Sequence, residues 1–250
     1  MTLVQPPTFR VAARNLPEHA RNAIHTDAGA QAAGFPRALV AGVTTYAYLT
    51  HVPTLAWGLD WISSGAAEVR LHRPVFEHDP LECVARFGDD DSTMTVEAFV
   101  NGDAGEAERP RAVLHALRSA APTQDRPGET LQERTIQLTG EWGDYGRRAG
   151  DPLALYADGG IVHPAVWPSL ANHIVHTQLA RGPWVHTRSV IRHHGAAMVG
   201  ASAIVRAVVV DRFFRNGERA VLDVRIEIDG ALVASLEHEA IIDLAARPPA

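Results

Sequence analysis

The chain has 250 residues, a formal net charge of −6 and no lysine, so all 23 of its basic residues are arginines. The missing lysine excludes a Schiff base to pyridoxal phosphate, a lysine-type aldolase and a phosphate-loop or kinase-type lysine. The negative charge argues against a general nucleic-acid binder. The single cysteine, Cys83, excludes an internal disulfide and a cysteine-rich zinc site, and its apolar neighbours predict a core residue.

The N-terminal segment Met1 to Arg10 has neither the basic start nor the apolar run of a signal peptide. No window of the chain reaches the apolar length needed to span a membrane. We therefore expect a cytoplasmic protein without a membrane partner.

The first half of the chain begins with an alanine-rich segment, Asn22 to Pro53, whose pattern is mostly helical. Glycine and proline interrupt this segment, and its part from Gly42 to His51 is predicted to form a buried helix. Alternating apolar residues then predict three strands, Ala67–Leu71, Leu81–Phe87 and Thr93–Val100, with a turn at Asp89 to Asp91 between the last two. A further strand, Arg111–Arg118, closes this half.

The proline-containing segment Ser119 to Thr130 is polar and is the main candidate for a linker. We expect an N-terminal domain at residues 1–120, a linker at 121–130 and a C-terminal domain at 131–250. The second half repeats the plan of the first, with a short strand, a helix and four long strands: Arg134–Thr139, Ala165–Leu179, Val185–His193, Ser202–Phe213, Ala220–Ile228 and Leu232–Leu244. Asn216-Gly217 and Asp229-Gly230 are predicted hairpin turns. A helix followed by an antiparallel meander, found twice, indicates a duplicated α+β fold.

Three blocks in the first half resemble the hydratase motif of the MaoC-like acyl-CoA dehydratases: Asn22-Ala23-Ile24-His25-Thr26-Asp27, Ala33-Gly34-Phe35-Pro36 and Leu39-Val40-Ala41-Gly42. Two further blocks resemble strands of that family, Pro74-Val75 with Asp79-Pro80-Leu81, and Val221-Leu222-Asp223 through Leu236, His238 and Ala240-Ile241. The resemblance covers nearly the whole chain. It implies a double hotdog fold, in which two antiparallel sheets are each wrapped around a central helix.

The resemblance also implies an acyl thioester substrate, carried by coenzyme A or an acyl carrier protein, with no cofactor, and a further association into a homodimer. In the family, an Asp-x-Asn-Pro-aliphatic-His block adds or removes water. Asn22 and His25 match its Asn and His, whereas Ala23 stands at the Pro and Ala20 stands at the Asp. The expected activity is therefore a hydratase or dehydratase with an altered acid–base pair, with His25 as the general acid/base and Asn22 as the residue that orients the reactant.

Asp27 is the third catalytic candidate, because it and Glu18 are the carboxylates nearest to His25 in the sequence. The alternative for Asp27 is an N-cap of a helix over Ala28 to Ala33. Gly42 opens the predicted buried helix, so its backbone N–H is a candidate to polarise the thioester carbonyl; the alternative is a glycine needed for close packing.

The second half supplies the remaining candidates for substrate binding. His163 precedes its predicted helix and Asn172 lies within that helix, in the region that corresponds to a second active site. Alternation predicts that Trp184, His186 and Arg188 share one face of a strand, lining either a pocket mouth or a solvent-facing row. His173 and His176 share a helix face but lack a third ligand, so no metal is predicted.

Two other functions fit the same residues. One is an acyl-CoA thioesterase of the same fold, which would release a free thiol. The other is a protein that binds an acyl thioester without turnover, or that tailors one as a cyclase, and the alanine at position 20 motivates it.

Overall fold

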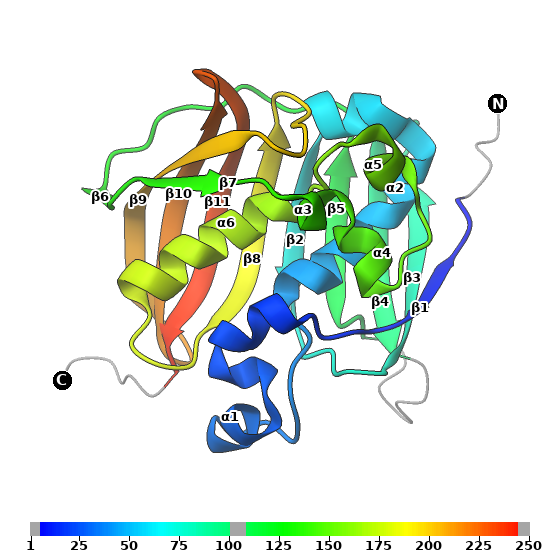
Figure 1. The fold of residues 1–250 in the computed structure, drawn as a ribbon. Helices are drawn as coiled ribbons and strands as arrows, with labels where there is room; N and C mark the ends of the chain where they lie inside the picture. The colour runs from blue at the N-terminus through cyan, green and yellow to red at the C-terminus, as the bar shows by residue number, and fades with distance from the viewer. Residues whose placement is uncertain (1–5, 101–108, 245–250) are drawn as a thin grey trace.

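The computed structural model describes residues 6–100 and 109–244, so the first half of the segment Met1 to Arg10 lies outside the described residues. Its strands form one antiparallel sheet of eleven strands that curves around two helices (Figure 1). The first half supplies β1 (Phe9–Ala12), β2 (Ala66–Leu71), β3 (Pro80–Phe87), β4 (Thr93–Val100) and β5 (Ala112–Leu117). The second half supplies β6 (Glu129–Thr130), β7 (Arg134–Gln137), β8 (Val185–His193), β9 (Ser202–Phe214), β10 (Glu218–Ile228) and β11 (Ala231–Asp243).

Helix α2 (Gly42–Ser64) lies on the first half of the sheet, and α6 (Val166–Ile174) lies on the second half and continues as a π-helical turn, Val175–Leu179 (Figure 1). The remaining helices are short: the 3₁₀ turns Pro17–Arg21 and Ala23–His25, α1 (Asp27–Ala32), α3 (Gly140–Gly143), α4 (Tyr145–Ala149) and α5 (Leu155–Gly159). Neither β1 nor α3, α4 and α5 was predicted, because their patterns are too short to show a period.

The predicted buried helix that begins at Gly42 is confirmed, but it extends past His51 to Ser64. Pro53 lies inside this helix, where it cannot donate a backbone hydrogen bond, and the helix bends at Gly58, whose φ is +59°. Burial explains the tolerance, because nearly every residue from Val43 to Thr54 is removed from solvent. Tertiary packing therefore outweighs the local cost of the proline.

The strands and turns of the second half follow the sequence pattern closely. The predicted strand Val185–His193 coincides with β8. Both predicted hairpin turns adopt the left-handed backbone expected of them, with φ of 55° and 115° at Asn216 and Gly217 and of 50° and 77° at Asp229 and Gly230. Cys83 is fully buried in the core, and this burial raises the pKa of its thiol, as expected of an inert core residue.

The two halves share one plan down to single residues. Just before each central helix the chain makes an isolated bridge to a later segment, Leu39 to Phe76 in the first half and Ile161 to Met198 in the second. Counted from these bridges, Gly42 and Pro164 hold equivalent positions. The duplicated order confirms the double hotdog, and the two sheets are joined edge to edge through β2 and β8, which pair from Ala66–Arg192 to Arg70–Arg188.

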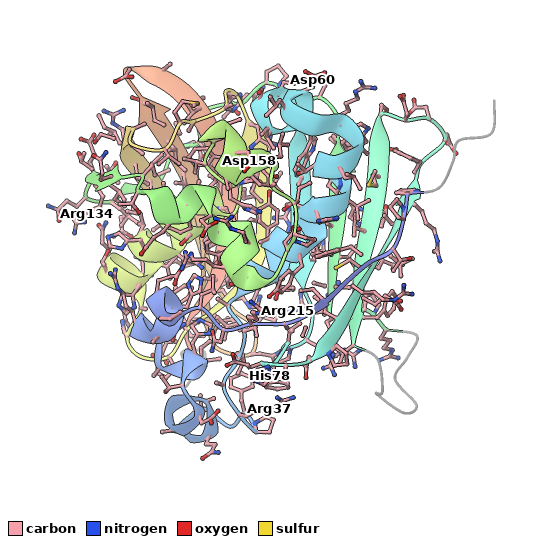
Figure 2. The ribbon with its side chains drawn as sticks, turned by 45° about the vertical axis from the view of Figure 1, so that its right-hand side comes forward. Arg37, Asp60, His78, Arg134, Asp158 and Arg215 are labelled. Carbon is pink, nitrogen blue, oxygen red and sulfur yellow. The ribbon has the colours of Figure 1, made fainter. Side chains whose placement is uncertain are left out.

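The halves also cover one another. Helices α4 and α5, from the second half, lie over α2 of the first (Figure 1), in a region where Figure 2 draws many side chains. The Tyr48 hydroxyl donates to the carbonyl oxygen of Ala149 at 2.8 Å, and the hydroxyls of Thr44 and Tyr145 bond each other at 2.7 Å. The predicted division at residues 121–130 therefore stays a prediction about sequence organisation, since the packing crosses it.

Within the described residues, no helix combines the length and the apolar character needed to cross a membrane. Across the same residues, no cluster of three or more histidine, cysteine or acidic side chains is arranged to hold a metal ion.

Candidate functional site

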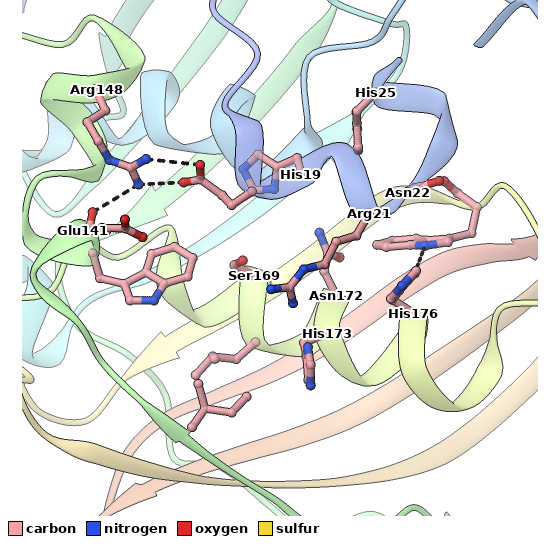
Figure 3. Close-up of a pocket in the computed structure, with 15 residues that line it drawn as sticks. His19, Arg21, Asn22, His25, Glu141, Arg148, Ser169, Asn172, His173 and His176 are labelled. Carbon is pink, nitrogen blue, oxygen red and sulfur yellow. Dashed lines mark hydrogen bonds and ion pairs between the residues drawn. The ribbon is translucent and has the colours of Figure 1, made fainter. Parts of the chain in front are cut away.

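Two adjoining cavities lie where the first half's segment 17–42 meets the second half. The α6 cavity, of about 290 Å³, is lined by α6 and by charged side chains from Pro17–Arg21, α3 and α4 (Figure 3). The α2 cavity, of about 280 Å³, lies at the N-terminal end of α2 and the start of β8. Four residues line both cavities and so form their common wall: Asn22, His25, Asn172 and Trp184.

Asn22 is held in a defined orientation. Its side chain is 6% exposed, and its Nδ2 donates to the carbonyl oxygen of Trp184 at 2.8 Å. A carbonyl oxygen only accepts, so the amide nitrogen must face Trp184 and the Oδ1 atom points elsewhere. This Oδ1 is buried and has no hydrogen-bond partner among the described residues. Asn22 therefore lines both cavities and carries an acceptor whose hydrogen-bonding capacity is unfilled among the described residues.

His25 is oriented by the backbone just ahead of α2. Its Nδ1 lies 2.8 Å from the carbonyl oxygen of Leu39, so Nδ1 carries the proton and Nε2 carries the lone pair in the neutral ring. Burial lowers the pKa of His25, and the bond to Leu39 opposes part of that shift. The ring is thus neutral near pH 7 and has an acceptor nitrogen, which is the state a general base requires.

The carboxylates proposed as partners for His25 are engaged elsewhere. Glu18 forms a two-pronged ion pair with Arg148 at 2.6 and 3.1 Å (Figure 3). Burial alone would raise the pKa of the Glu18 carboxyl, but the hydrogen bonds from Arg148 outweigh it and hold the pKa below its usual range. Its neighbour His19 packs edge-on to His25, with ring centres 6.0 Å apart, and bonds the Tyr145 hydroxyl at 2.8 Å.

Asp27 is neither beside His25 in a cavity nor the N-cap of α1, the two roles predicted for it. It is exposed and lines neither cavity; its Oδ1 accepts from the Ala38 N–H at 2.8 Å. It is not the N-cap either, because α1 begins at Asp27 itself and the Thr26 hydroxyl caps the helix by accepting from the Gly29 N–H at 3.3 Å. Asp27 instead closes the loop between α1 and α2.

Gly42 and His186 meet in the α2 cavity. Gly42 is the first residue of α2, and the first N–H groups of a helix have no acceptor within the helix. A β-carbon at position 42 would lie 2.5 Å from Leu71 Cδ1 and 3.1 Å from His186 Nδ1. The close-packing prediction for Gly42 is confirmed, since the lack of a side chain brings a buried histidine against a helix N-terminus. Its role at a thioester carbonyl stays a prediction.

Two other predicted binding residues are placed elsewhere. His163 is 1% exposed and lines neither cavity; its Nδ1 accepts from the Ala165 N–H at 3.1 Å, and its ring packs against Tyr156 at 4.4 Å between ring centres. Burial lowers its pKa to about 4. It is a core residue rather than a substrate ligand. Asn172, by contrast, lies on the common wall, beside Asn22 and His25 of the first half and not in a separate second site, and its buried Oδ1 has no partner among the described residues.

Arg188 also departs from its prediction, because β8 does not alternate regularly. A bulge opposite Glu239–Ala240 inserts an extra residue, so that Arg188 turns to the outer face and pairs with Glu68 at 2.7 Å and with Glu237. The same bulge brings His186 and Ser189 onto the inner face, where they are hydrogen-bonded at 2.8 Å. Ser189 was not singled out in the sequence, since a regular strand would place residues three apart on opposite faces.

A scan against protein-family models finds no match for this chain, and a search of curated proteins finds none either. Solved structures do match. A Mycobacterium tuberculosis protein described as having a double hotdog fold superposes with a TM-score of 0.66 at 12% identity, covering 96% of each chain. A protein from Chloroflexus aurantiacus that carries the name of a MaoC domain dehydratase gives 0.63 at 12% identity, covering 98% of this chain and 97% of that one.

A third solved structure, an acyl-ACP thioesterase from Bacteroides thetaiotaomicron, gives a TM-score of 0.55 at 8% identity, covering 94% of this chain and 97% of that one. Dehydratases and thioesterases thus share this architecture. At 8–12% identity such likenesses establish the fold and not the reaction. By its topology and by these likenesses, the chain is a double hotdog protein.

Proposed function

We propose that this protein acts on acyl thioesters as a hydratase or dehydratase, with a single histidine, His25, moving the proton. The observation that carries the proposal is that His25, Asn22 and Gly42, the first residue of α2, all line the α2 cavity, while His25 Nε2 carries a lone pair and Asn22 Oδ1 has no partner among the described residues. The fold is shared with proteins named as dehydratases and thioesterases, which supports the substrate class.

In the hydration direction, Asn22 Oδ1 and His25 Nε2 hold a water molecule between them. The water oxygen bonds to the β-carbon of the enoyl thioester while its proton passes to His25 Nε2, and the electron pair of the double bond moves toward the thioester oxygen. The N-terminus of α2 stabilises that developing charge. His25 then returns the proton to the α-carbon, so one water is added and the ring is neutral again.

The residues that line the two cavities suggest that each cavity binds a different part of the substrate. The α2 cavity carries many apolar side chains and suits a short acyl chain; they include Ile24, Phe35, Leu39, Val40, Leu71 and Val75. The α6 cavity carries charged and histidine side chains and suits the polar arm of coenzyme A or of an acyl carrier protein. Because the thioester joins the acyl chain to the carrier, it would lie at the common wall beside His25.

The test is whether the protein hydrates trans-2-enoyl-CoA substrates of several chain lengths. Hydration is measured as the loss of the enoyl thioester absorbance. Replacing His25 with alanine should slow hydration by about 100-fold or more, the usual contribution of a general acid–base group. His194→Ala is the matched control, because His194 is half-buried and hydrogen-bonded but lines neither cavity. Absence of turnover by the wild type, or an unimpaired His25→Ala enzyme, would refute the proposal.

Hydrolysis is the second candidate, and one observation favours it. Asn22 and Asn172 both carry a buried, unpartnered Oδ1 on the common wall, and two such acceptors can hold a water for attack on the thioester carbonyl. A thiol-trapping reagent separates the two reactions, because only hydrolysis releases free coenzyme A. Thiol release without any hydroxyacyl product would assign the protein to the thioesterases.

A further inference from the structure

A chain of three buried side chains runs from the α2 cavity into the core. His186 Nε2 lies 2.8 Å from Ser189 Oγ, and Ser189 Oγ lies 2.8 Å from His238 Nδ1 on the neighbouring strand β11. The two imidazole rings stack with centres 4.4 Å apart. His186 is 6% exposed, and Ser189 and His238 are fully buried. The outer nitrogens, His186 Nδ1 and His238 Nε2, have no partner among the described residues.

The position of the protons in this chain follows from hydrogen-bond counting. Ser189 has one proton to donate, so one histidine receives it and the other donates an N–H to the serine oxygen. If His186 donated from Nε2, then His238 would accept at Nδ1 and would carry its own proton on Nε2, as an orphaned donor in the core. If Ser189 instead donates to His186 Nε2, then His238 donates from Nδ1 and the orphaned N–H is that of His186 Nδ1. A buried N–H without an acceptor is costly, and only this second arrangement leaves it on a residue of the cavity wall, where a ligand can accept it, because His238 lines neither cavity. The favoured arrangement is therefore His238 Nδ1–H to Ser189, and Ser189 O–H to His186 Nε2.

That arrangement leaves the proton of His186 on Nδ1, the nitrogen that faces Gly42. A β-carbon on Gly42 would stand only 3.1 Å from this nitrogen, so the Nδ1–H and the N-terminus of α2 are neighbours at the wall of one cavity. Two donors at one place with no protein acceptor form a binding position for an oxygen that gains negative charge.

We propose that the Nδ1–H of His186, together with the Gly42 backbone N–H, binds the thioester oxygen of the substrate, and that Ser189 and His238 are positioning residues that hold His186 in this tautomer. The inference rests on the proposed function, because it places the thioester at the α2 N-terminus. It makes His186 a catalytic residue that donates a hydrogen bond but transfers no proton.

A neutral histidine suits this role. Burial lowers the pKa of His186 to about 4, although a hydrogen bond with the Arg188 backbone opposes part of the shift. Burial and the neighbouring His186 lower the pKa of His238 well below its ordinary value, so both rings are uncharged near pH 7. An uncharged N–H can stabilise an enolate-like oxygen throughout the reaction without releasing its proton. A charged imidazolium in the same place would be costly to bury before the substrate arrives.

The first experiment determines the tautomer in the free protein and requires no substrate. Nitrogen-15 NMR of histidine-labelled protein distinguishes a ring protonated on Nδ1 from one protonated on Nε2, and the His186→Asn spectrum assigns the signal. We expect the Nδ1–H form in the wild type and its loss in Ser189→Ala. A wild-type His186 protonated on Nε2 overturns the inference, whatever reaction the enzyme catalyses.

The second experiment measures polarisation of a bound thioester, using butyryl-CoA labelled with ¹³C at the carbonyl, which cannot be hydrated. The carbonyl stretching frequency should fall on binding to the wild type and to His186→Asn, whose amide N–H lies near the place of Nδ1. It should fall much less with His186→Leu, in which only the Gly42 N–H remains to bind the oxygen. His193→Leu is the matched control, since His193 lies on the same face of β8 and is 1% exposed but lines neither cavity.

Turnover completes the test. His186→Leu should lose about 100-fold or more in kcat, the usual effect of removing one such donor, whereas His186→Asn recovers most of it and KM changes little in either. Ser189→Ala should lose about tenfold, because the ring is then free to adopt either tautomer. Equal losses in His186→Leu and in the control overturn the inference while leaving the proposed function intact. Failure of every thioester to bind refutes the proposed function instead.

Discussion

Each half of this molecule has a segment between its first strand and its central helix, and the two segments pack differently. In the first half, residues 13–41 arch away from the helix and leave two cavities, with His25 half-buried at their common wall. In the second half, residues 138–165 pack down on α2, and His163 is enclosed with Tyr145 and Tyr156. The duplication therefore keeps one open site and turns the other into core.

The positions three residues after the isolated bridges show the same contrast. Gly42 is the first residue of α2 and has a backbone N–H, whereas Pro164, two residues before α6 begins at Val166, has none. The second half therefore lacks a backbone donor at the position that Gly42 holds in the first half. Among the described residues, both halves therefore supply residues to the cavities, but only in the first half does the segment before the central helix leave a cavity open.

The largest expected effect comes from replacing the residues at these equivalent positions, one at a time, with alanine. Gly42→Ala would force a β-carbon against Leu71 and His186 and should reduce kcat by about 100-fold or more, by displacing donors from the thioester oxygen. The same assay on Pro164→Ala should give wild-type activity. Comparable losses in both variants would show that the two halves contribute equally to the site.

A smaller effect distinguishes His163 from His25: the first should change how stability depends on pH, and the second how activity does. The pKa of His163 falls from its ordinary 6.5 to about 4 on folding, so between these values the unfolded chain binds a proton there and the folded chain does not. Stability must therefore fall as the pH falls, by up to about 1.4 kcal/mol per pH unit from this residue. The free energy of unfolding, measured with urea between pH 7 and pH 4, should depend less steeply on pH in His163→Asn than in the wild type. An unchanged slope would contradict the buried, neutral assignment.

For His25, the expected effect of pH is on the rate of hydration and not on stability. Its lowered pKa predicts that hydration declines only at a pH below 6.5, where the ring takes up a proton and loses its acceptor nitrogen. The acidic limb of kcat/KM against pH should be present in His163→Asn and absent from the residual activity of His25→Ala. A limb that survives the loss of His25 would assign the titration to another group.

The smallest effect concerns how firmly the open segment is held. Thr26→Ala removes the side-chain cap of α1 and should cost about 1 kcal/mol of stability. Thr139→Ala is the counterpart in the second half, where the N-cap of α3 makes no side-chain bond, so thermal melting should barely change. Equal shifts in melting temperature for the two variants would show that the cap of α1 contributes nothing specific.

Local pattern was sufficient for most of the sheet and for part of the site. The strands alternate, the Asn-Gly and Asp-Gly turns need left-handed backbone, and Gly42 marks the start of a buried helix, because each of these depends on a few neighbouring residues. Asn22 and His25 could be selected because a polar block ahead of an apolar helix is visible in the sequence. The missing carboxylate at Ala20 was visible in the same way.

Only the tertiary structure decided which candidates meet. The bulge in β8 sends Arg188 outward and aligns His186 with Ser189, and it depends on the register with β11. The burial of His163 depends on short helices that have no periodicity of their own. Asn22 is oriented by the carbonyl of Trp184, which lies 162 positions later in the chain. Sequence pattern specifies elements whose contacts are local, whereas a site assembled from both halves exists only once long-range packing has placed them together.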